Sequence, residues 1–349
     1  MCKHSFMKNR KDILQRTVEH FDIKAVDTRS LVNAMDNMSF SARDLARATG
    51  IYNSMLSDKD CTIVLAIAGS SSAAGCMQVY VDMVKNKMVD AVVATCATIV
   101  DMDFFEALGY KHYQGTPNVN DQDLCRLGID RIYDTFIDEH ELTACDKMIQ
   151  TIADGMNPGI YSSREFIGEM GKYLVAHSKK KNSLIQAAYE NGVPIFCPAF
   201  SDGSAGYGLV WHQEARPDAH VSIDSVKDFR ELTHLKMEAK ETGVFIIGGG
   251  TPKNFIQDTV SCAKGLGASV PMHKYALQIT VADVRDGACS SSTLKEASSW
   301  GKVNTDNEQM VYGEATTIIP LMISHAYHTG LWKNREKREY TKLYQERSH

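Results

Sequence analysis

The stretch TIVLAIAGSSSAAG, residues 62–75, decides the fold. Residues 62–68 form a continuous apolar run rich in β-branched side chains, which is typical of a strand buried on both faces of a parallel sheet. A glycine- and serine-rich turn follows and leads into a helix with Met77, Tyr80 and Val84 at helical spacing. A second apolar strand over residues 89–95 completes a predicted β-α-β unit.

The same strand, turn and helix pattern recurs twice. Residues 184–190 predict a helix that Gly192 ends, before a strand at 194–200. A further helix is expected to start in a capping box at Ser225, with Val226, Phe229 and Leu232 on one face, before a strand at 244–247. After that strand, Thr251 suits an N-cap and Pro252 the first helical position. We therefore predict an α/β fold: a doubly wound, mostly parallel, Rossmann-type sheet with flanking helices.

The domain organisation follows from these patterns. Residues 1–58 are polar-rich and predicted to be a helical N-terminal segment. Residues 59–332 are expected to form the α/β domain, with a helical insertion at about 109–181. Residues 333–349 read as a charged tail, either a solvated helix or a frayed end.

Composition narrows the class of protein. The chain has 349 residues, of which 23% are charged and 44% hydrophobic, and its formal net charge is −5. These values exclude a disordered, collagen-like or coiled-coil chain and argue against binding to nucleic acid. Neither a signal peptide nor an apolar run of ~20 residues is present, so we expect a cytoplasmic protein without a membrane contact. The nine cysteines form no C-x-x-C pair and no H-E-x-x-H occurs, so no metal is predicted and most cysteines are expected to be apolar fillers.

Three strand ends carry glycine- and serine-rich loops, at residues 69–75, 203–206 and 248–250. In doubly wound sheets, ligands bind beyond the carboxyl ends of the strands, where backbone N–H groups can approach a phosphate. No loop matches G-x-G-x-x-G, and each alone is equally well explained as a tight turn. Together they favour an anion or dinucleotide site, at which Asp202 and Glu314 bind ribose hydroxyls or a cationic substrate. The alternative for each carboxylate is a helix cap or a surface charge.

Lys302 is the most informative cation, because Trp300 and Gly301 precede it directly. A lysine packed against an indole loses water, which favours the neutral amine that acts as a nucleophile. The indole also suits a cationic amine by cation–π attraction. The alternative is a solvent-facing lysine beside a half-buried tryptophan. His212 and His234 are interpreted as core or surface histidines.

Taken in order, residues 201–206, the glycine run at 248–250 and Glu296-x-x-x-Trp300-Gly301-Lys302 resemble the deoxyhypusine synthase family over about residues 60–330. The resemblance implies an NAD-dependent aminobutyl transferase, usually a homotetramer with active sites at subunit interfaces. In that family NAD takes a hydride from spermidine, 1,3-diaminopropane leaves, and the aminobutyl group passes through an enzyme lysine to a lysine of a translation-factor precursor. That enzyme lysine is similar in position to Lys302, which is thus the predicted catalytic residue.

The resemblance also implies the other site residues. Asp101 is favoured over Asp103 by spacing, as a contact to either cofactor or amine. The implied cofactor residues are Gly69, Ser70, Ser71, Ser72, Ala73, Thr95, Cys96, Ala97, Asp101, Asp202, Ala282, Asp286, Glu314 and Ala315. Gly249, Glu296 and Trp300 match the polyamine pocket.

Three pocket positions depart from the family pattern. Tyr207 and Cys289 stand where the family has aspartates, and Asn254 stands where it has a histidine. The loss of two carboxylates that would pair with ammonium groups implies an altered amine specificity. The leading hypothesis is therefore aminoalkyl transfer from spermidine or a related polyamine or diamine to an acceptor that is a protein lysine or a small amine.

Three alternatives stay open. The first is a homospermidine synthase acting on putrescine or spermidine. The second is a non-catalytic NAD or polyamine binding protein, motivated by the three altered positions. The third, an NAD-consuming deacylase, is disfavoured because the chain lacks the paired cysteines of a zinc module.

Overall fold

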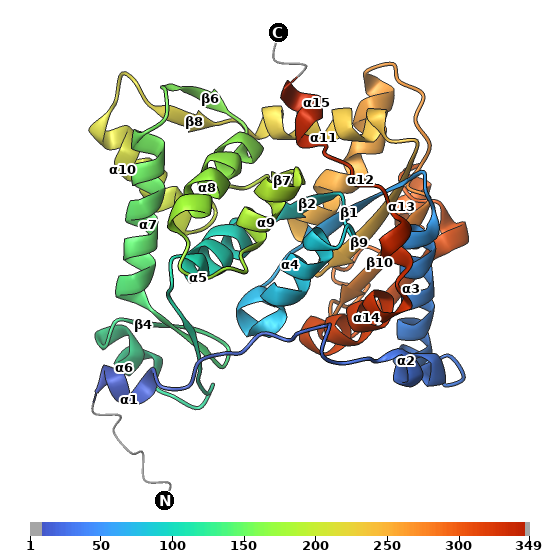
Figure 1. The fold of residues 1–349 in the computed structure, drawn as a ribbon, viewed down its shortest axis with the longest axis horizontal. Helices are drawn as coiled ribbons and strands as arrows, with labels where there is room; N and C mark the ends of the chain where they lie inside the picture. Colours follow the sequence, from blue (N-terminus) through green and yellow to red (C-terminus); the bar gives the residue numbers. More distant parts are fainter. Residues whose placement is uncertain (1–8, 346–349) are drawn as a thin grey trace, which may run out of the picture.

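A six-stranded parallel sheet forms the centre of the computed structural model, which describes residues 9–345. Its strands run in the order β11-β10-β9-β1-β2-β7, and every pairing is parallel. The bounds are β1 (Cys61–Ile67), β2 (Ala91–Ala94), β7 (Ile195–Phe196), β9 (Glu241–Ile247), β10 (Tyr275–Thr280) and β11 (Glu308–Tyr312). The predicted α/β fold with a mostly parallel sheet is confirmed (Figure 1).

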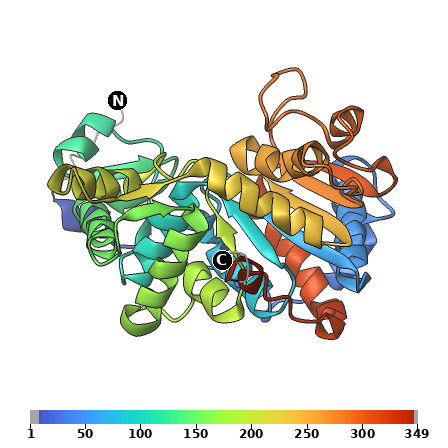
Figure 2. The same ribbon diagram turned by 90° about the horizontal axis from the view of Figure 1, so that it is seen from above.

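Both faces of β1 are buried, as its unbroken apolar run predicts. Ile63, Leu65 and Ile67 belong to the core on one face, and Val64 and Ala66 to the core on the other. The first face carries α3 (Phe40–Ser57), α4 (Met77–Lys85) and α14 (Ala315–Thr329). The second carries α11 (Ser225–Glu238), α12 (Gly250–Gly265) and α13 (Leu294–Ser299), so helices cover both faces (Figure 2).

The strand order reverses between β1 and β9. From β1 the chain builds outward through β2 to β7, and it then returns to β9 and builds outward through β10 to β11. Such a reversal opens a crevice at the carboxyl ends of the two central strands, where open α/β sheets bind their ligands. Gly69 and Gly248 lie directly after these two strands.

A second part of the molecule lies beside the main sheet (Figure 2). It contains a three-stranded sheet in the order β3-β5-β4, from β3 (His112–Gln114), β4 (Ile129–Ile132) and β5 (Thr135–Asp138), and the pair β6 (Gly159–Tyr161) and β8 (Val221–Ile223). Its helices are α5 (Phe105–Ala107), α6 (Asp121–Arg126), α7 (Glu139–Asp154), α8 (Ser163–His177), α9 (Leu184–Asn191) and α10 (Ser204–Ala215).

The N-terminal segment is helical only in part. It holds α1 (Arg10–Ile13), α2 (Arg29–Met35) and α3, while residues 14–28 connect the two parts of the molecule without a helix. Thr17 forms a bridge with Tyr113, and the Phe21 N–H donates to the carbonyl of Gly75 at 2.9 Å. Cys2 lies outside the described residues.

Helix ends were predicted with mixed success. Gly192 ends α9 in the left-handed conformation, with φ 68°, as predicted. Ser225 was wrong as a cap, because Asp224 accepts the N–H groups of Val226 and Lys227 at 2.8 and 3.1 Å. Val226 is also 74% exposed, so it does not share the buried face of Leu232.

Thr251 was wrong as the N-cap of α12, which begins at Gly250 after Gly249. The cap comes from a distant loop, since the Gly250 N–H donates to the hydroxyl of Ser290 at 3.1 Å. A local sequence window cannot reveal such a partner.

The described part of the charged tail is anchored through one of its arginines. Arg335 is 7% exposed, and its guanidinium lies 2.5 Å from the carboxylate of buried Asp90. The same side chain donates to the carbonyls of Lys87 and Met55 at 2.8 and 3.1 Å. Beyond it, α15 (Thr341–Gln345) carries Tyr344, which is buried against Phe196 of β7.

We expect Arg335→Ala to lower the free energy of unfolding by about 3 kcal/mol or more, because Asp90 would remain buried without its partner. Urea titration measures this change. Lys337→Ala, which removes an ion pair with Glu339 between partly exposed side chains, should cost under about 1 kcal/mol. Equal losses in the two variants would contradict a structural role for the buried pair.

Candidate functional site at the carboxyl edge of the sheet

The turn after β1 offers free backbone donors. Gly69 has φ +89°, and a Cβ placed on it would meet nothing within 4 Å, so the space above it is open. Within residues 9–345, the N–H groups of Gly69, Ser70 and Ser71 donate to no protein acceptor. Consecutive free N–H groups in a turn form an anion-binding concavity. These N–H groups can therefore bind an anion such as a phosphate; that the turn is a cofactor loop stays a prediction.

Two π-helical turns shape this edge. One spans Ser72–Cys76, with Ser72 and Ala73 buried, and the other spans Ala97–Phe104 directly after Thr95 and Cys96. They are joined by the Thr98 hydroxyl, which donates to the Gly69 carbonyl at 3.4 Å and lies 3.2 Å from the Thr95 hydroxyl. Single π-helical turns occur often at functional sites. The first and second predicted cofactor loops are thus adjacent.

Asp101 and Asp103 have different surroundings. Asp103 is 1% exposed and accepts three hydrogen bonds, from the Ser183 hydroxyl and the Leu184 and Ile185 N–H groups, at 2.7 to 2.8 Å. It therefore holds the start of α9 and, being buried, does not face a ligand. Asp101 accepts one backbone bond, from the Ser204 N–H at 3.1 Å. Of the two carboxylates that spacing left open, Asp101 is the one available to a ligand.

Asp146 is a neighbour of Asp101 that the sequence did not reveal. It lies on α7, is 3% exposed, and its Oδ1 has no hydrogen-bond partner. Burial raises the pKa of Asp101 to about 6 and that of Asp146 to about 7, and Ser204 opposes the rise at both carboxyl groups. Asp202 is exposed nearby and adds negative charge to the surroundings of Asp101. Asp146 comes close to Asp101 only because α7 packs against α10, and no local sequence motif encodes this packing.

Cys96 is not a reactive thiol. It is 1% exposed, and contact with the Cys197 thiol together with burial raises its pKa well above the usual range. A Cβ on Gly203 would lie 3.0 Å from its sulfur, so glycine at 203 permits this close packing. Cys61, Cys76, Cys145 and Cys197 are buried as well, as predicted for apolar fillers.

The β9 side of the edge is held by a buried lysine. Lys253 is fully buried on α12, and its ammonium donates to the carbonyls of Cys289 and Ser292 and to the Ser292 hydroxyl. Burial lowers its pKa to about 8. Gly249 lies against Ser290, since a Cβ there would come within 2.4 Å of the Ser290 Cα. Lys253 therefore fixes the loop that carries Ala282, Asp286 and Cys289 onto α12; sequence reasoning missed it.

Lys302 lies away from this edge. Its ammonium is 2.5 Å from Asp258 and 5.2 Å from the centre of the Trp300 ring, which confirms the predicted indole contact. Asp258 lies eight residues beyond Gly250 in α12, and a rise of about 1.5 Å per residue puts it roughly 12 Å from the glycine end. The indole is 69% exposed. Within one chain, the lysine and the predicted phosphate loop are therefore separate.

The other predicted site residues lie at helix starts or on helix surfaces. Glu314 is the N-cap of α14, because its carboxylate accepts the Thr317 N–H at 3.3 Å. Ala315 is the first residue of that helix. Glu296 is exposed and completes a capping box with Thr293. Asn254 is half-buried on α12, and Tyr207, on α10, is 62% exposed. His212 is buried and 2.6 Å from Asp154, as expected for a core histidine.

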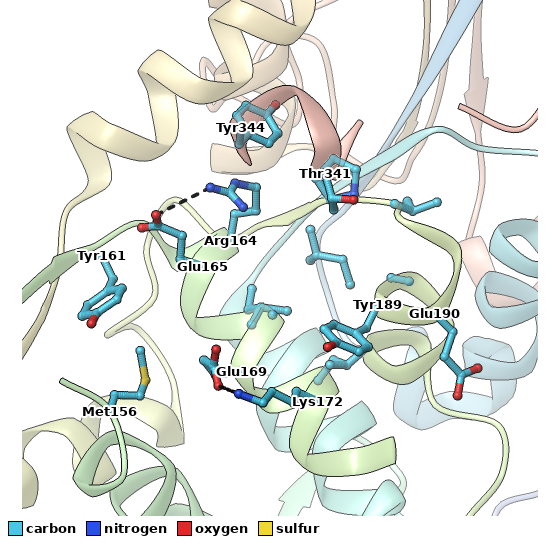
Figure 3. Close-up of a pocket in the computed structure, with 17 residues that line it drawn as sticks. Met156, Tyr161, Arg164, Glu165, Glu169, Lys172, Tyr189, Glu190, Thr341 and Tyr344 are labelled. Atoms are coloured by element: carbon cyan, nitrogen blue, oxygen red, sulfur yellow. Dashed lines mark hydrogen bonds and ion pairs between the residues drawn. The ribbon is translucent and has the colours of Figure 1, made fainter. Parts of the chain in front are cut away.

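The structure also contains a cavity of about 830 Å³ at the amino end of β7 (Figure 3). Its lining includes Tyr161, Glu165, Lys172, Tyr189 and Ile195. Because Ile195 opens β7, the cavity lies at the opposite end of that strand from residues 201–206. None of the predicted site residues lines it.

Within residues 9–345, no group of three or more histidine, cysteine, aspartate or glutamate side chains is arranged to hold a metal ion. Over the same residues, no helix has the length and apolar character needed to span a bilayer.

The known proteins that this chain resembles share one family description. The family model described as "Deoxyhypusine synthase" matches residues 30–326. The chain is 62% identical over 340 residues to a "Deoxyhypusine synthase-like protein" of Coxiella burnetii, covering 97% of each chain. It is 38% identical over 308 residues to a "Probable deoxyhypusine synthase 2" of Methanosarcina mazei, covering 88% of each.

Among solved structures, the chain resembles a "putative deoxyhypusine synthase from Entamoeba histolytica" in fold, with a TM-score of 0.58, 18% identity, and coverage of 93% of this chain and 99% of that one. The predicted family resemblance is confirmed by the family model and by the identity to the curated relatives. The chain therefore belongs to the deoxyhypusine synthase family.

Proposed function

We propose that the protein is an NAD-dependent transferase that moves an aminoalkyl group from spermidine or a related amine, through an imine on Lys302, to an acceptor amine. The proposal rests on the presence of two separate features in one chain. Lys302 lies against the exposed indole of Trp300, and the free N–H groups of residues 69–71 lie at the same edge of the sheet as Asp101 and Asp202. An amine-transfer enzyme with a nucleotide cofactor needs both groups.

NAD would be held at the carboxyl edge of the sheet. The free N–H groups of Gly69, Ser70 and Ser71 suit its pyrophosphate, and the exposed carboxylate of Asp202 suits ribose hydroxyls. The open space above Gly69 leaves room for close approach of a ligand. When bound, the nicotinamide supplies the hydride acceptor and donor that amine oxidation and reduction require.

Lys302 is the proposed nucleophile. Its nitrogen would attack the imine carbon of the oxidised amine and displace the leaving amine, so that the aminoalkyl group becomes bound to the enzyme. The ammonium of Lys302 must lose a proton before its nitrogen can attack. The Asp258 carboxylate, at 2.5 Å, is the nearest acceptor for that proton.

A second copy of the chain would complete the site. The separation of Lys302 from the phosphate turn leaves each half-site incomplete within one chain. Apolar side chains near both halves are exposed, with Trp300 69%, Val281 76% and Tyr207 62% accessible. Exposed apolar side chains near a site are typical of a surface that a partner covers. We therefore propose a cytoplasmic homo-oligomer, in keeping with the homotetramer that the family resemblance implies.

The identity of the amine is tested by product analysis. We expect incubation with NAD, labelled spermidine and putrescine to yield 1,3-diaminopropane and a labelled aminobutyl product, read by mass spectrometry. Homospermidine among the products would identify a small-amine acceptor, and label on a protein lysine the alternative. Tyr207, Asn254 and Cys289 supply no carboxylate, so acceptance of amines other than spermidine is expected as well. Amine binding without any product would contradict the transferase proposal and favour a binding protein.

A further inference from the structure

One buried lysine beside the sheet makes no ion pair. Lys236, near the end of α11, is 1% exposed, and burial lowers its pKa to about 8. Within residues 9–345 its ammonium bonds to no carboxylate and donates instead to the hydroxyl of Thr242 on β9, at 2.7 Å. Taking a charge out of water without pairing it costs stability, and an apolar side chain of similar volume would serve the fold better. Stability therefore does not explain this lysine.

The Thr242 hydroxyl also contacts a buried histidine. Its oxygen lies 2.8 Å from Nδ1 of His273, and Nε2 of the same ring lies 3.2 Å from the carbonyl of Ile256 on α12. Because a carbonyl only accepts, Nε2 carries a proton and donates it. Burial and the charge of Lys236 hold the pKa of His273 well below its usual range, so the ring is neutral and Nδ1 accepts from Thr242. Each hydrogen bond from Lys236 to Ile256 thus has a single direction.

His273 also holds the main chain around Lys302. Its N–H donates to the Lys302 carbonyl at 2.9 Å, and its carbonyl accepts the N–H of Asn304 at 2.9 Å. These bonds form a parallel bridge between His273 and the buried Val303. The ring of the same histidine binds α12 two residues before Asp258, whose carboxylate lies 2.5 Å from the Lys302 ammonium. His273 is thus bonded both to the segment that carries Lys302 and to the helix that carries its ion-pair partner.

We propose that His273 is a positioning residue for the transfer reaction: it holds Lys302 against Asp258, the acceptor of the proton that the lysine loses before attack. Thr242 and Lys236 fix the ring of His273 in the tautomer that binds α12. The ring itself is buried and bonded at both nitrogens, so it contacts neither substrate nor cofactor. The inference rests on the proposed role of Lys302 and adds the residues that set the geometry of this nucleophile.

Two substitutions at residue 273 separate the roles of the two ring nitrogens. The amide of glutamine can take the place of Nε2 and donate to Ile256, whereas that of asparagine reaches only the place of Nδ1, beside Thr242. We expect His273→Asn to lower kcat with NAD and spermidine about 30-fold, and His273→Gln to recover most of this loss. The KM for spermidine and the calorimetric affinity for NAD should change less than about 3-fold, because a buried residue binds neither ligand. A loss confined to KM would overturn the proposal.

A double-mutant cycle with Asp258 tests whether the effect passes through Lys302. Asp258→Asn already removes the benefit of the position that His273 maintains, so adding His273→Asn should lower kcat less than about 3-fold further. A general weakening of the fold would instead multiply the two single effects, and that result would overturn the proposal. His112→Asn is the matched control, because His112 is equally buried and the asparagine amide keeps the Nδ1 contact with Glu106. Its kcat should match that of the wild type.

Two further variants test the chain if His273→Asn folds poorly. Thr242→Val keeps the shape of the side chain on β9 but donates nothing to Nδ1, so kcat should fall about 5-fold, and by little more when Asp258→Asn is present. Lys236→Met should lower kcat without lowering the melting temperature, because it removes an unpaired buried charge. Wild-type kcat in both Thr242→Val and Lys236→Met would overturn the role of the chain.

The outcome is separable from the proposed function. Absence of product from the wild-type protein would overturn the transferase, and the hold on residues 302–304 is then read by hydrogen exchange. Exchange of the Asn304 N–H, which bonds to the His273 carbonyl, should rise in His273→Asn and stay near the wild-type rate in His273→Gln. Product formation at the wild-type rate in a folded His273→Asn protein would overturn only this inference.

Discussion

Lys302→Ala is expected to abolish turnover, with a loss on the order of a thousandfold or more, while NAD still binds. If Lys302 forms the covalent bond, as proposed above, neither water nor a neighbouring side chain can take its place. The ring of Trp300 and the turn at Gly69 should stay in place, because the backbone bonds of residue 302 remain: the His273 N–H donates to its carbonyl at 2.9 Å, and its own N–H donates to the Ala297 carbonyl at 3.1 Å. Calorimetry with NAD and product analysis with spermidine measure the two effects separately.

Two matched variants make the result specific. Lys295→Ala removes an exposed lysine from α13, one turn before Trp300, and should leave turnover unchanged. Asp258→Asn keeps the nucleophile but removes its proton acceptor, so turnover should fall less than in Lys302→Ala. Retained turnover in Lys302→Ala would contradict covalent transfer through this residue.

The fold was predictable from the sequence because continuous apolar runs mark the strands that are buried on both faces of the sheet. A strand buried on both faces reads as a continuous apolar run, and residues 62–68 have this pattern without interruption. Helix ends were less predictable, because Gly250 is capped by Ser290 and Asp224 lies outside the motif that was expected. Partners supplied from a distant loop leave no local signal.

In the candidate site, too, some residues were predictable from local sequence and others were not. The glycine- and serine-rich turns follow strands, and Lys302 belongs to a short motif, so local sequence singled them out as candidates. Asp146 and Lys253 sit within ordinary helices. Only packing shows that Asp146 Oδ1 is buried without a hydrogen-bond partner within residues 9–345 and that Lys253 holds a loop. Asp103 was separable from Asp101 only by its three hydrogen bonds. Spacing fixes neighbours along the chain, whereas burial and satisfaction of polar atoms arise from the three-dimensional structure.

Mixed assembly of two inactive variants is expected to restore activity. Lys302→Ala lacks the nucleophile, and Asp101→Asn combined with Asp202→Asn disables the carboxyl edge, so each protein alone should be inactive. If one subunit supplies Lys302 and its partner the carboxyl edge, a mixed pair contains one intact site and one doubly damaged site. Random pairing makes half of the pairs mixed, so co-expressed chains should recover roughly a quarter of wild-type turnover.

The amount recovered discriminates between arrangements of the site. A site built within one chain would give no recovery, because every chain in the mixture carries a defect. Mixing the purified variants without co-expression should restore activity only as fast as subunits exchange, which size-exclusion chromatography of differently tagged chains can follow. Recovery is also independent of which amine is used, because it depends only on where Lys302 and Asp101 reside. The roughly 12 Å along α12 between the lysine side and the glycine end is the physical reason to expect recovery.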